Sequence, residues 1–227
     1  MSQKFTILFD LDGTLVDTAP DLILAHNHVM KKFGFPSKSS EDIRNLVGMG
    51  AKTMMGRSLW SSAKQELKKI TEKDMKEKMV KEFINYYSEN ILVKSKLIDG
   101  VENFLIWCKK NKVSMAVCTN KQERLAIDLL KKIKINKYFD YVAGCDTFEY
   151  CKPDPRHLTS VVEIVGGDLK KSIMIGDSDV DAKSAENASL PFVLLEDGYT
   201  DVKVSQIKHN HLIKNLNNLH NFIIRYL

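Results

Sequence analysis

The residues of this sequence that could do chemistry are acids, hydroxyls, an amide and a lysine, and most of them follow short apolar runs. They are Asp10, Asp12 and Thr14 after residues 5–9, Thr119 and Asn120 after residues 113–118, Asp177, Ser178 and Asp181 after residues 173–176, and Lys152 in the loop before Pro153. Carboxylates that converge in one place repel one another, and a divalent cation relieves that repulsion. Because the set contains no His or Cys, its oxygen ligands favour a hard cation such as magnesium. A metal and a lysine together would suit a phosphate group on the substrate.

Each short motif also has an ordinary structural reading. The Asp-x-Asp-Gly motif at residues 10–13 can be a simple turn, and Gly-Asp-Ser at residues 176–178 can be a helix N-cap. Thr119 and Asn120 can cap the next helix, and Lys152 alone can be a solvated lysine. The joint occurrence of all these motifs, each in order and beside an apolar run, favours the chemical reading over coincidence.

Short apolar runs alternate with helical patterns over most of the chain. The apolar runs cover residues 5–9, 113–118, 141–143, 173–175 and 192–195, and the helical patterns cover residues 101–110, 122–132, 156–165 and 179–188. Unbroken apolar runs suit strands that are covered on both faces, as in a parallel sheet. We therefore predict an α/β fold with a Rossmann-like, doubly wound parallel sheet. Ligands of such sheets bind outside the carboxyl ends of the strands, where the polar clusters fall.

One stretch, residues 18–94, interrupts this alternation and contains no convincing strand. We predict that it is an all-helical domain inserted into the α/β core. The core would then consist of residues 1–17 and 95–227, and the inserted helical cap domain of residues 18–94.

Two patterns inside the insert have a structural meaning. One is a stripe of large apolar side chains four residues apart, formed by Met75, Met79, Phe83 and Tyr87. Helical spacing of this kind favours packing over a cofactor site. The other is the pair Gly48 and Gly50 around Met49, which indicates a loop.

Four motifs of the chain, taken in this order, resemble the signatures of the haloacid dehalogenase-like hydrolase superfamily. They are Phe9-Asp10-Leu11-Asp12-Gly13-Thr14-Leu15-Val16-Asp17, Thr119-Asn120-Lys121, Lys152-Pro153-Asp154-Pro155 and Gly176-Asp177-Ser178-Asp179-Val180-Asp181. The resemblance extends from Phe5 to about Leu195, and the subgroup that the sequence resembles best is the phosphoglycolate phosphatase-like one. The helical insert lies where such enzymes carry a small cap domain.

The resemblance implies a role for each matching acid. Asp10 is expected to be the nucleophile and to form an aspartyl-phosphate, a covalent intermediate. Asp12 is expected to be the general acid for the leaving alcohol and then the base for the hydrolytic water. The implied ligands of Mg²⁺ are the Asp10 carboxylate, the Asp12 main-chain carbonyl and Asp177. An acid at position 12 favours phosphoester hydrolysis over dehalogenation, because dehalogenation leaves no alcohol to protonate.

The resemblance also implies roles for the neighbouring polar residues. Thr119 and the amide of Asn120 are expected to hold the phosphoryl oxygens, and Lys152 to neutralise the nucleophile and the transferring group. Asp181 is expected to orient Lys152 or a metal-bound water. Ser178 and Thr14 are expected to support these residues.

Substrate selection is expected to come from the cap. We predict that Arg44 and the loop formed by Gly48, Met49 and Gly50 select the substrate. Arginine can bind a second anionic group such as a carboxylate, although a plain surface position for Arg44 is an equally good reading. The cap is expected to act as a lid that closes over the substrate and excludes bulk water.

These inferences predict a magnesium-dependent phosphatase for a small phosphate monoester, with 2-phosphoglycolate as the first candidate. Three alternatives stay open. One is a sugar-phosphate mutase of the β-phosphoglucomutase type, another is a nucleotide or pyrophosphate phosphatase, and the third is a non-catalytic binding protein of the same fold.

Bulk composition argues against several other classes of protein. The 34 basic and 29 acidic residues are scattered and leave a formal charge of only +5, which argues against a nucleic-acid partner. No apolar window approaches the roughly 18 residues of a membrane span, and no signal peptide is recognisable. The four cysteines form no C-x-x-C pair, so we expect reduced thiols and a cytoplasmic monomer or homodimer. His209-Asn210-His211 resembles a nuclease motif without its context, and we expect a solvent-facing segment.

Overall fold

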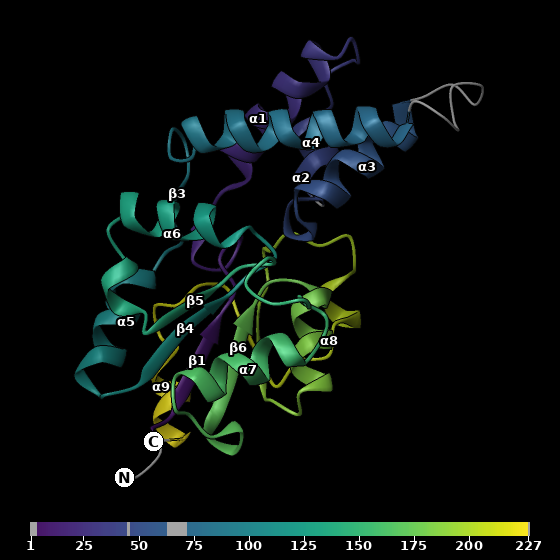
Figure 1. The fold of residues 1–227 in the computed structure, drawn as a ribbon. Helices are drawn as coiled ribbons and strands as arrows, with labels where there is room; N and C mark the ends of the chain where they lie inside the picture. The colour runs from purple at the N-terminus through teal and green to yellow at the C-terminus, as the bar shows by residue number, and fades with distance from the viewer. Residues whose placement is uncertain (1–3, 45, 63–71, 227) are drawn as a thin grey trace.

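A six-stranded, fully parallel sheet forms the centre of the molecule in the computed structural model, which describes residues 4–44, 46–62 and 72–226 (Figure 1). Its strand order is β5-β4-β1-β6-β7-β8. The strands are β1 (Thr6–Phe9), β4 (Ser114–Cys118), β5 (Tyr141–Ala143), β6 (Ser172–Gly176), β7 (Phe192–Leu195) and β8 (His211–Ile213). The first five lie at the apolar runs of the sequence, so the predicted α/β fold with a doubly wound parallel sheet is confirmed.

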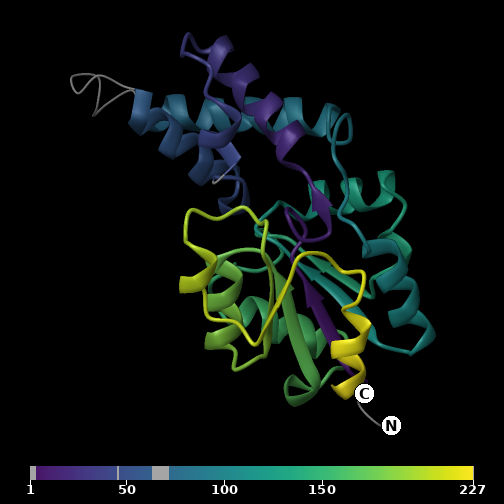
Figure 2. The ribbon, with the colours of Figure 1, turned by 180° about the vertical axis from the view of Figure 1, so that it is seen from behind.

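Helices cover both faces of this sheet, as Figures 1 and 2 show from opposite sides. One face packs against α5 (Val101–Lys110), α6 (Glu123–Lys132) and α9 (His220–Ile223), and the other against α7 (Arg156–Ile164) and α8 (Asp179–Asn187). Short 3₁₀ helices complete the core at η3 (Asn136–Tyr138), η4 (Leu169–Lys171), η5 (Val204–Gln206) and η6 (Ile224–Tyr226).

The central strand β1 is buried on both faces, which explains its unbroken apolar run. Ile7 and Phe9 belong to the core on the α5 side, whereas Leu8 between them belongs to the core on the α7 side. All three side chains are fully buried. Because successive side chains of a strand point to opposite faces, a strand between two helical layers is apolar at consecutive positions.

The inserted segment is helical, as predicted, and lies over the carboxyl ends of the strands (Figure 1). It contains α1 (Ala19–Lys32), α2 (Ser40–Arg44), the 3₁₀ turn η1 (Val47–Met49), α3 (Ala51–Ser62) and α4 (Glu72–Glu89). A two-stranded antiparallel ribbon of β2 (Val16–Asp17) and β3 (Lys96–Leu97) joins it to the core. The boundaries at residues 18 and 94 remain a prediction.

The start and the end of the cap are held together by Asp21 of α1. Its buried carboxylate accepts hydrogen bonds from the main-chain amides of Val93, Lys94 and Ser95, at 2.8–3.0 Å. These bonds lower the pKa of Asp21 even though burial acts in the opposite direction. The carboxylate therefore closes the cap at its junction with the core.

Two sequence interpretations gain detail from the structure. The predicted stripe on α4 packs inward, with Met79, Phe83 and Tyr87 buried. The segment His209-Asn210-His211, expected to face solvent, has an exposed Asn210 between two half-buried histidines. His211 begins the edge strand β8 and stacks on Phe222 with ring centroids 4.2 Å apart. In the described part of the chain, no helix is both long and apolar enough to cross a membrane.

Candidate active site

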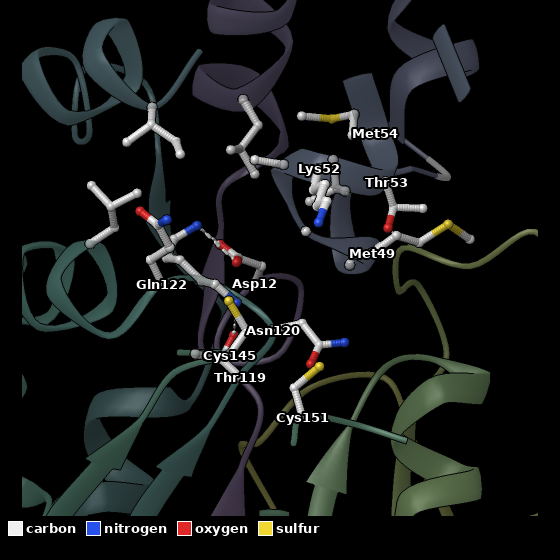
Figure 3. Close-up of a pocket in the computed structure, with 18 of the residues that line it drawn as sticks. Asp12, Met49, Lys52, Thr53, Met54, Thr119, Asn120, Gln122, Cys145 and Cys151 are labelled. Atoms are coloured by element: carbon white, nitrogen blue, oxygen red, sulfur yellow. Dashed lines mark hydrogen bonds and ion pairs between the residues drawn. The ribbon is translucent and has the colours of Figure 1, made fainter. Parts of the chain in front are cut away.

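The polar clusters predicted from the sequence meet at one end of the sheet. Asp10 follows β1 directly, Thr119 follows β4 and Asp177 follows β6, so the three lie at the carboxyl ends of neighbouring strands. A cavity of about 570 Å³ opens at this end, between the core and the cap (Figure 3). Its lining includes Asp10, Asp12, Thr119, Asn120 and Lys152 from the core and Gly48, Met49 and Gly50 from the cap.

Lys152 joins two acids at the base of this cavity. Its ammonium nitrogen lies 2.7 Å from Oδ1 of Asp10 and 2.6 Å from Oδ1 of Asp181. The other oxygen of Asp181 accepts hydrogen bonds from Ser178, whose hydroxyl also caps α8 in a capping box. The cap of α8 thus fixes Asp181, and Asp181 fixes the lysine beside Asp10.

Asp177 is held from two other segments. Thr14 Oγ1 donates to its Oδ1 at 3.0 Å, and the main-chain amide of Tyr199 donates to its Oδ2 at 2.6 Å. Gly13 has a positive φ of 86°, and a Cβ atom there would collide with the Asp177 carboxylate. Glycine at position 13 is therefore required both by the turn and by the close approach of Asp177.

The three buried acids Asp10, Asp177 and Asp181 offer oxygen atoms that all lie within 4.8 Å of one another. Burial raises the pKa of Asp10 to about 6, although Lys152 opposes the shift. Burial, with the charges of Asp10 and Asp181, also raises the pKa of Asp177 well above its ordinary value. Three carboxylates facing one ammonium group leave an excess of negative charge that a hard dication would neutralise. The donor set therefore fits a metal such as Mg²⁺.

The carboxylate of Asp12 has a different environment. Both of its oxygens lie 2.8 Å from the ammonium nitrogen of Lys121, and Thr18 Oγ1 donates to Oδ1 at 2.6 Å. Lys121 in turn lies over the ring of Tyr87 on cap helix α4, 4.7 Å from its centroid. The carboxylate of Asp12 is thus paired with Lys121 and does not belong to the cluster of three carboxylates, which Asp10, Asp177 and Asp181 form.

The remaining predicted residues divide between two places. Thr119 is buried and lines the cavity with Asp10 and Lys152. Asn120 lines it too, and its side-chain amide donates to the main-chain carbonyl of Lys152 at 3.1 Å. Arg44 does not line this cavity. It is exposed, donates to the carbonyl of Asp197 at 3.3 Å and lies over the ring of Tyr199, beside a second hollow of about 340 Å³.

Sequence reasoning missed the groups that hold these acids in place. Lys121 was part of a recognised motif, but only the fold brings it to Asp12. Thr18 and Tyr199 carried no signal, because an isolated threonine or tyrosine matches too many ordinary sites. Lys52 of the cap, which lines the cavity, was also missed. Its position two residues after the loop at residues 48–50 was the one available sign.

Comparison with known proteins agrees with this geometry. Residues 7–195 match the family model described as haloacid dehalogenase-like hydrolase. The chain is 36% identical to a phosphoglycolate phosphatase of Mesorhizobium japonicum, over 94% of this chain and 92% of that protein. It is 37% identical to a phosphoglycolate phosphatase of Agrobacterium fabrum, over 91% of this chain and 86% of that protein.

Solved structures show the same fold. A crystal structure of a predicted phosphoglycolate phosphatase from Haemophilus somnus superposes with a TM-score of 0.90 at 29% identity and covers 98% of this chain and 99% of that one. A β-phosphoglucomutase from Clostridium difficile superposes with a TM-score of 0.79 at 21% identity, covering 98% of this chain and 96% of that one. At that identity the likeness is one of fold alone.

Proposed function

The chain belongs to the haloacid dehalogenase-like hydrolase family and is a phosphoric monoester hydrolase, and we propose that its substrate is 2-phosphoglycolate or a similarly small carboxylated phosphate ester. The observation that supports this proposal best is the convergence of Asp10, Asp12, Thr119 and Lys152 on one cavity. The names of the relatives at 36–37% identity support the choice of 2-phosphoglycolate as the first candidate.

In the first half of the proposed reaction, a carboxylate oxygen of Asp10 attacks the phosphorus atom. The bond from phosphorus to the ester oxygen breaks, and that oxygen leaves with a proton from Asp12. Lys152 holds Asp10 in place and compensates the charge of the transferring group, while Thr119 and Asn120 bind phosphoryl oxygens.

In the second half, water attacks the phosphorus of the aspartyl-phosphate on Asp10, and Asp12 accepts a proton from that water. Inorganic phosphate leaves and the Asp10 carboxylate is regenerated. This second step requires Asp12 as a carboxylate, and the ammonium group of Lys121 lies 2.8 Å from both of its oxygens, where it can compensate that charge. In the first step Asp12 gives up a proton, so its contact with Lys121 must be loose during that step and form once the proton has left.

We propose Mg²⁺ as the metal, held by the carboxylates of Asp10 and Asp177 and the main-chain carbonyl of Asp12, with Asp181 nearby. Bound there, Mg²⁺ would neutralise the phosphoryl oxygens and the excess charge of the acids. The buried all-oxygen donor set supports this choice over zinc or copper, which favour nitrogen and sulfur ligands. A cytoplasmic setting, and a monomer or homodimer, remain expectations.

The test is a screen of phosphorylated metabolites at fixed Mg²⁺, ranked by kcat/KM. We expect 2-phosphoglycolate to rank first, with release of inorganic phosphate. A higher rank for nucleotides or pyrophosphate would overturn the substrate assignment. Formation of a bisphosphate intermediate from a sugar phosphate would indicate the mutase. No turnover of any phosphate ester would contradict the proposal as a whole.

A further inference from the structure

The part of the cavity that the cap lines has mostly apolar walls. Its apolar lining side chains are Leu22, Val47, Met54, Val80, Phe83 and Ile84. A phosphoryl group placed against Asp10 would leave the rest of a small substrate facing these walls. Polar groups on that side of the substrate therefore need partners that the apolar walls do not supply.

One lysine in this lining has no ion pair in the described part of the chain. Of the lysines that border the cavity, Lys152 is paired with Asp10 and Lys121 with Asp12. Lys52 makes no such pair, and Figure 3 shows its ammonium nitrogen directed from the cap into the cavity. Its positive charge is therefore available to a bound anionic group.

The backbone around Lys52 is also electropositive. Lys52 lies in the first turn of α3, a helix of 12 residues with no acid in that turn, and Ala51 and Thr53 line the cavity beside it. The first amides of a helix have no partner within the helix and form its positive end. Anions bind at such ends. Side chain and helix end thus favour the same kind of group.

An independent observation comes from another cap helix, α4. Tyr87 of α4 lines the cavity and is 1% exposed, yet its hydroxyl has no hydrogen-bond acceptor within the described residues, because the ammonium group of Lys121 beside it can only donate. A buried hydroxyl whose proton has no acceptor is uncommon in folded proteins and calls for a ligand or a water. A carboxylate oxygen in the cavity would accept the hydrogen bond that the hydroxyl can donate.

We propose that Lys52, with the first turn of α3 and the hydroxyl of Tyr87, forms a second anion subsite that binds the carboxylate of a short phosphate ester. This inference rests on the proposed function and names its specificity-determining residue. Arg44, which the sequence suggested for this role, lies beside the other hollow. A neutral polyol of the same length would leave Lys52 unpaired and would place its hydroxyls against apolar walls, so the subsite selects against it.

The experiment compares two substrates that differ only in this group, 2-phosphoglycolate and 2-hydroxyethyl phosphate, in the full-length enzyme with Mg²⁺. Lys52→Met should lower kcat/KM for 2-phosphoglycolate by about 10- to 100-fold and change that for 2-hydroxyethyl phosphate by less than about threefold. Lys52→Arg should restore part of the loss. Lys81→Met is the matched control, because Lys81 is an exposed lysine of the same cap outside the cavity lining, and it should change neither value.

An equal fall for both substrates in Lys52→Met, or no fall for 2-phosphoglycolate, would overturn the subsite. A binding measurement separates this failure from a failure of the proposed function. In the Asp10→Asn background, titration calorimetry should show tighter binding of 2-phosphoglycolate than of 2-hydroxyethyl phosphate, and Lys52→Met should remove that difference. If the wild-type enzyme turned over neither ester, the proposed function would fail, and the titration would still decide for or against the subsite.

Discussion

At the scale of single residues, the ion pair between Asp12 and Lys121 is the contact that sequence reasoning did not anticipate. Both side chains are almost fully buried, at 9% and 5% exposure, and the lysine approaches both carboxylate oxygens. Removing one partner of a buried pair leaves a charge without compensation, which costs more than removing both. The pair therefore has a measurable signature in stability that is separate from any effect on turnover.

We predict that Lys121→Met lowers the free energy of unfolding by about 3 kcal/mol or more, because the Asp12 carboxylate stays buried and loses its ion pair. Adding Asp12→Asn to this variant should recover part of the loss, since no buried charge then remains. Urea denaturation of the wild type, both single variants and the double variant checks this. A double variant as unstable as the sum of the two singles would show that the pair does not couple.

A second residue-scale prediction concerns His157 of α7. Its side chain is fully buried, and in the described residues no side chain forms a hydrogen bond with either ring nitrogen. Burial, reinforced by the charge of Lys152, lowers the pKa of His157 to about 4. Between pH 6.5 and 4 the unfolded chain therefore binds a proton that the folded chain does not, so this residue makes stability fall as the pH falls through that range.

From this shift we expect His157 to cost about 2 kcal/mol of stability on going from pH 7 to pH 5. His157→Leu removes the titrating group, so the variant should gain about that amount relative to the wild type over the same interval. Urea denaturation of both proteins at the two pH values measures the difference. Parallel losses in the two proteins would exclude His157 as the source.

At the scale of elements, the turn after β1 is what places Asp177 beside Asp10. Gly13 and Gly34 both have positive φ values, of 86° and 78°, but only the Cβ atom at position 13 would meet Asp177, whereas that at position 34 would meet open space. Comparing substitutions at these two glycines therefore separates the effect of backbone strain from the effect of displacing Asp177.

We predict that Gly13→Ala and Gly34→Ala each cost about 1 kcal/mol through backbone strain, but that only Gly13→Ala impairs catalysis. Displacing Asp177 should lower kcat by about 100-fold and raise the Mg²⁺ concentration needed for half-maximal activity. Thermal denaturation and Mg²⁺ titrations of activity measure both effects. A Gly34→Ala variant as inactive as Gly13→Ala would point to general strain in place of a displaced ligand.

The sequence pattern predicted the buried strands better than the short strands that exist only through pairing with distant segments. The buried strands were visible because β1, β4 and β6 are covered on both faces and are apolar after their first residues, Thr6, Ser114 and Ser172. The edge strand β8, with a partly exposed His-Leu-Ile pattern, and the two-residue strands β2 and β3 were too short or too mixed to stand out. Their existence depends on pairing with distant segments.

The same distinction applies to the candidate site. Residues at strand ends, such as Asp10, Thr119 and Asp177, were predictable because parallel strands bring their carboxyl ends to one edge. Arg44 and Lys52 were not separable by sequence, because both are cations of the helical insert. Only the orientation of the cap over the core directs Lys52 into the cavity and places Arg44 beside Tyr199 and Asp197.

At the scale of the whole molecule, the site is divided between two parts with different tasks. The core supplies Asp10 and Asp177 from the ends of its central strands and Lys152 from the loop before α7, and the cap supplies most of the apolar walls, Lys52 and Tyr87. Tyr87 also lies against Lys121, so the cap touches the residue that holds Asp12. We therefore propose that the core carries out the chemistry and that the cap sets which substrate is accepted.

The account depends above all on Asp10 as the residue that receives the phosphoryl group. The direct measurement is rapid acid quenching of the enzyme with ³²P-labelled 2-phosphoglycolate and Mg²⁺, followed by mapping of the labelled peptide. We predict a hydroxylamine-sensitive acyl phosphate on Asp10, and neither label nor turnover in Asp10→Asn. Label on a different residue, or wild-type turnover by Asp10→Asn, would contradict the account.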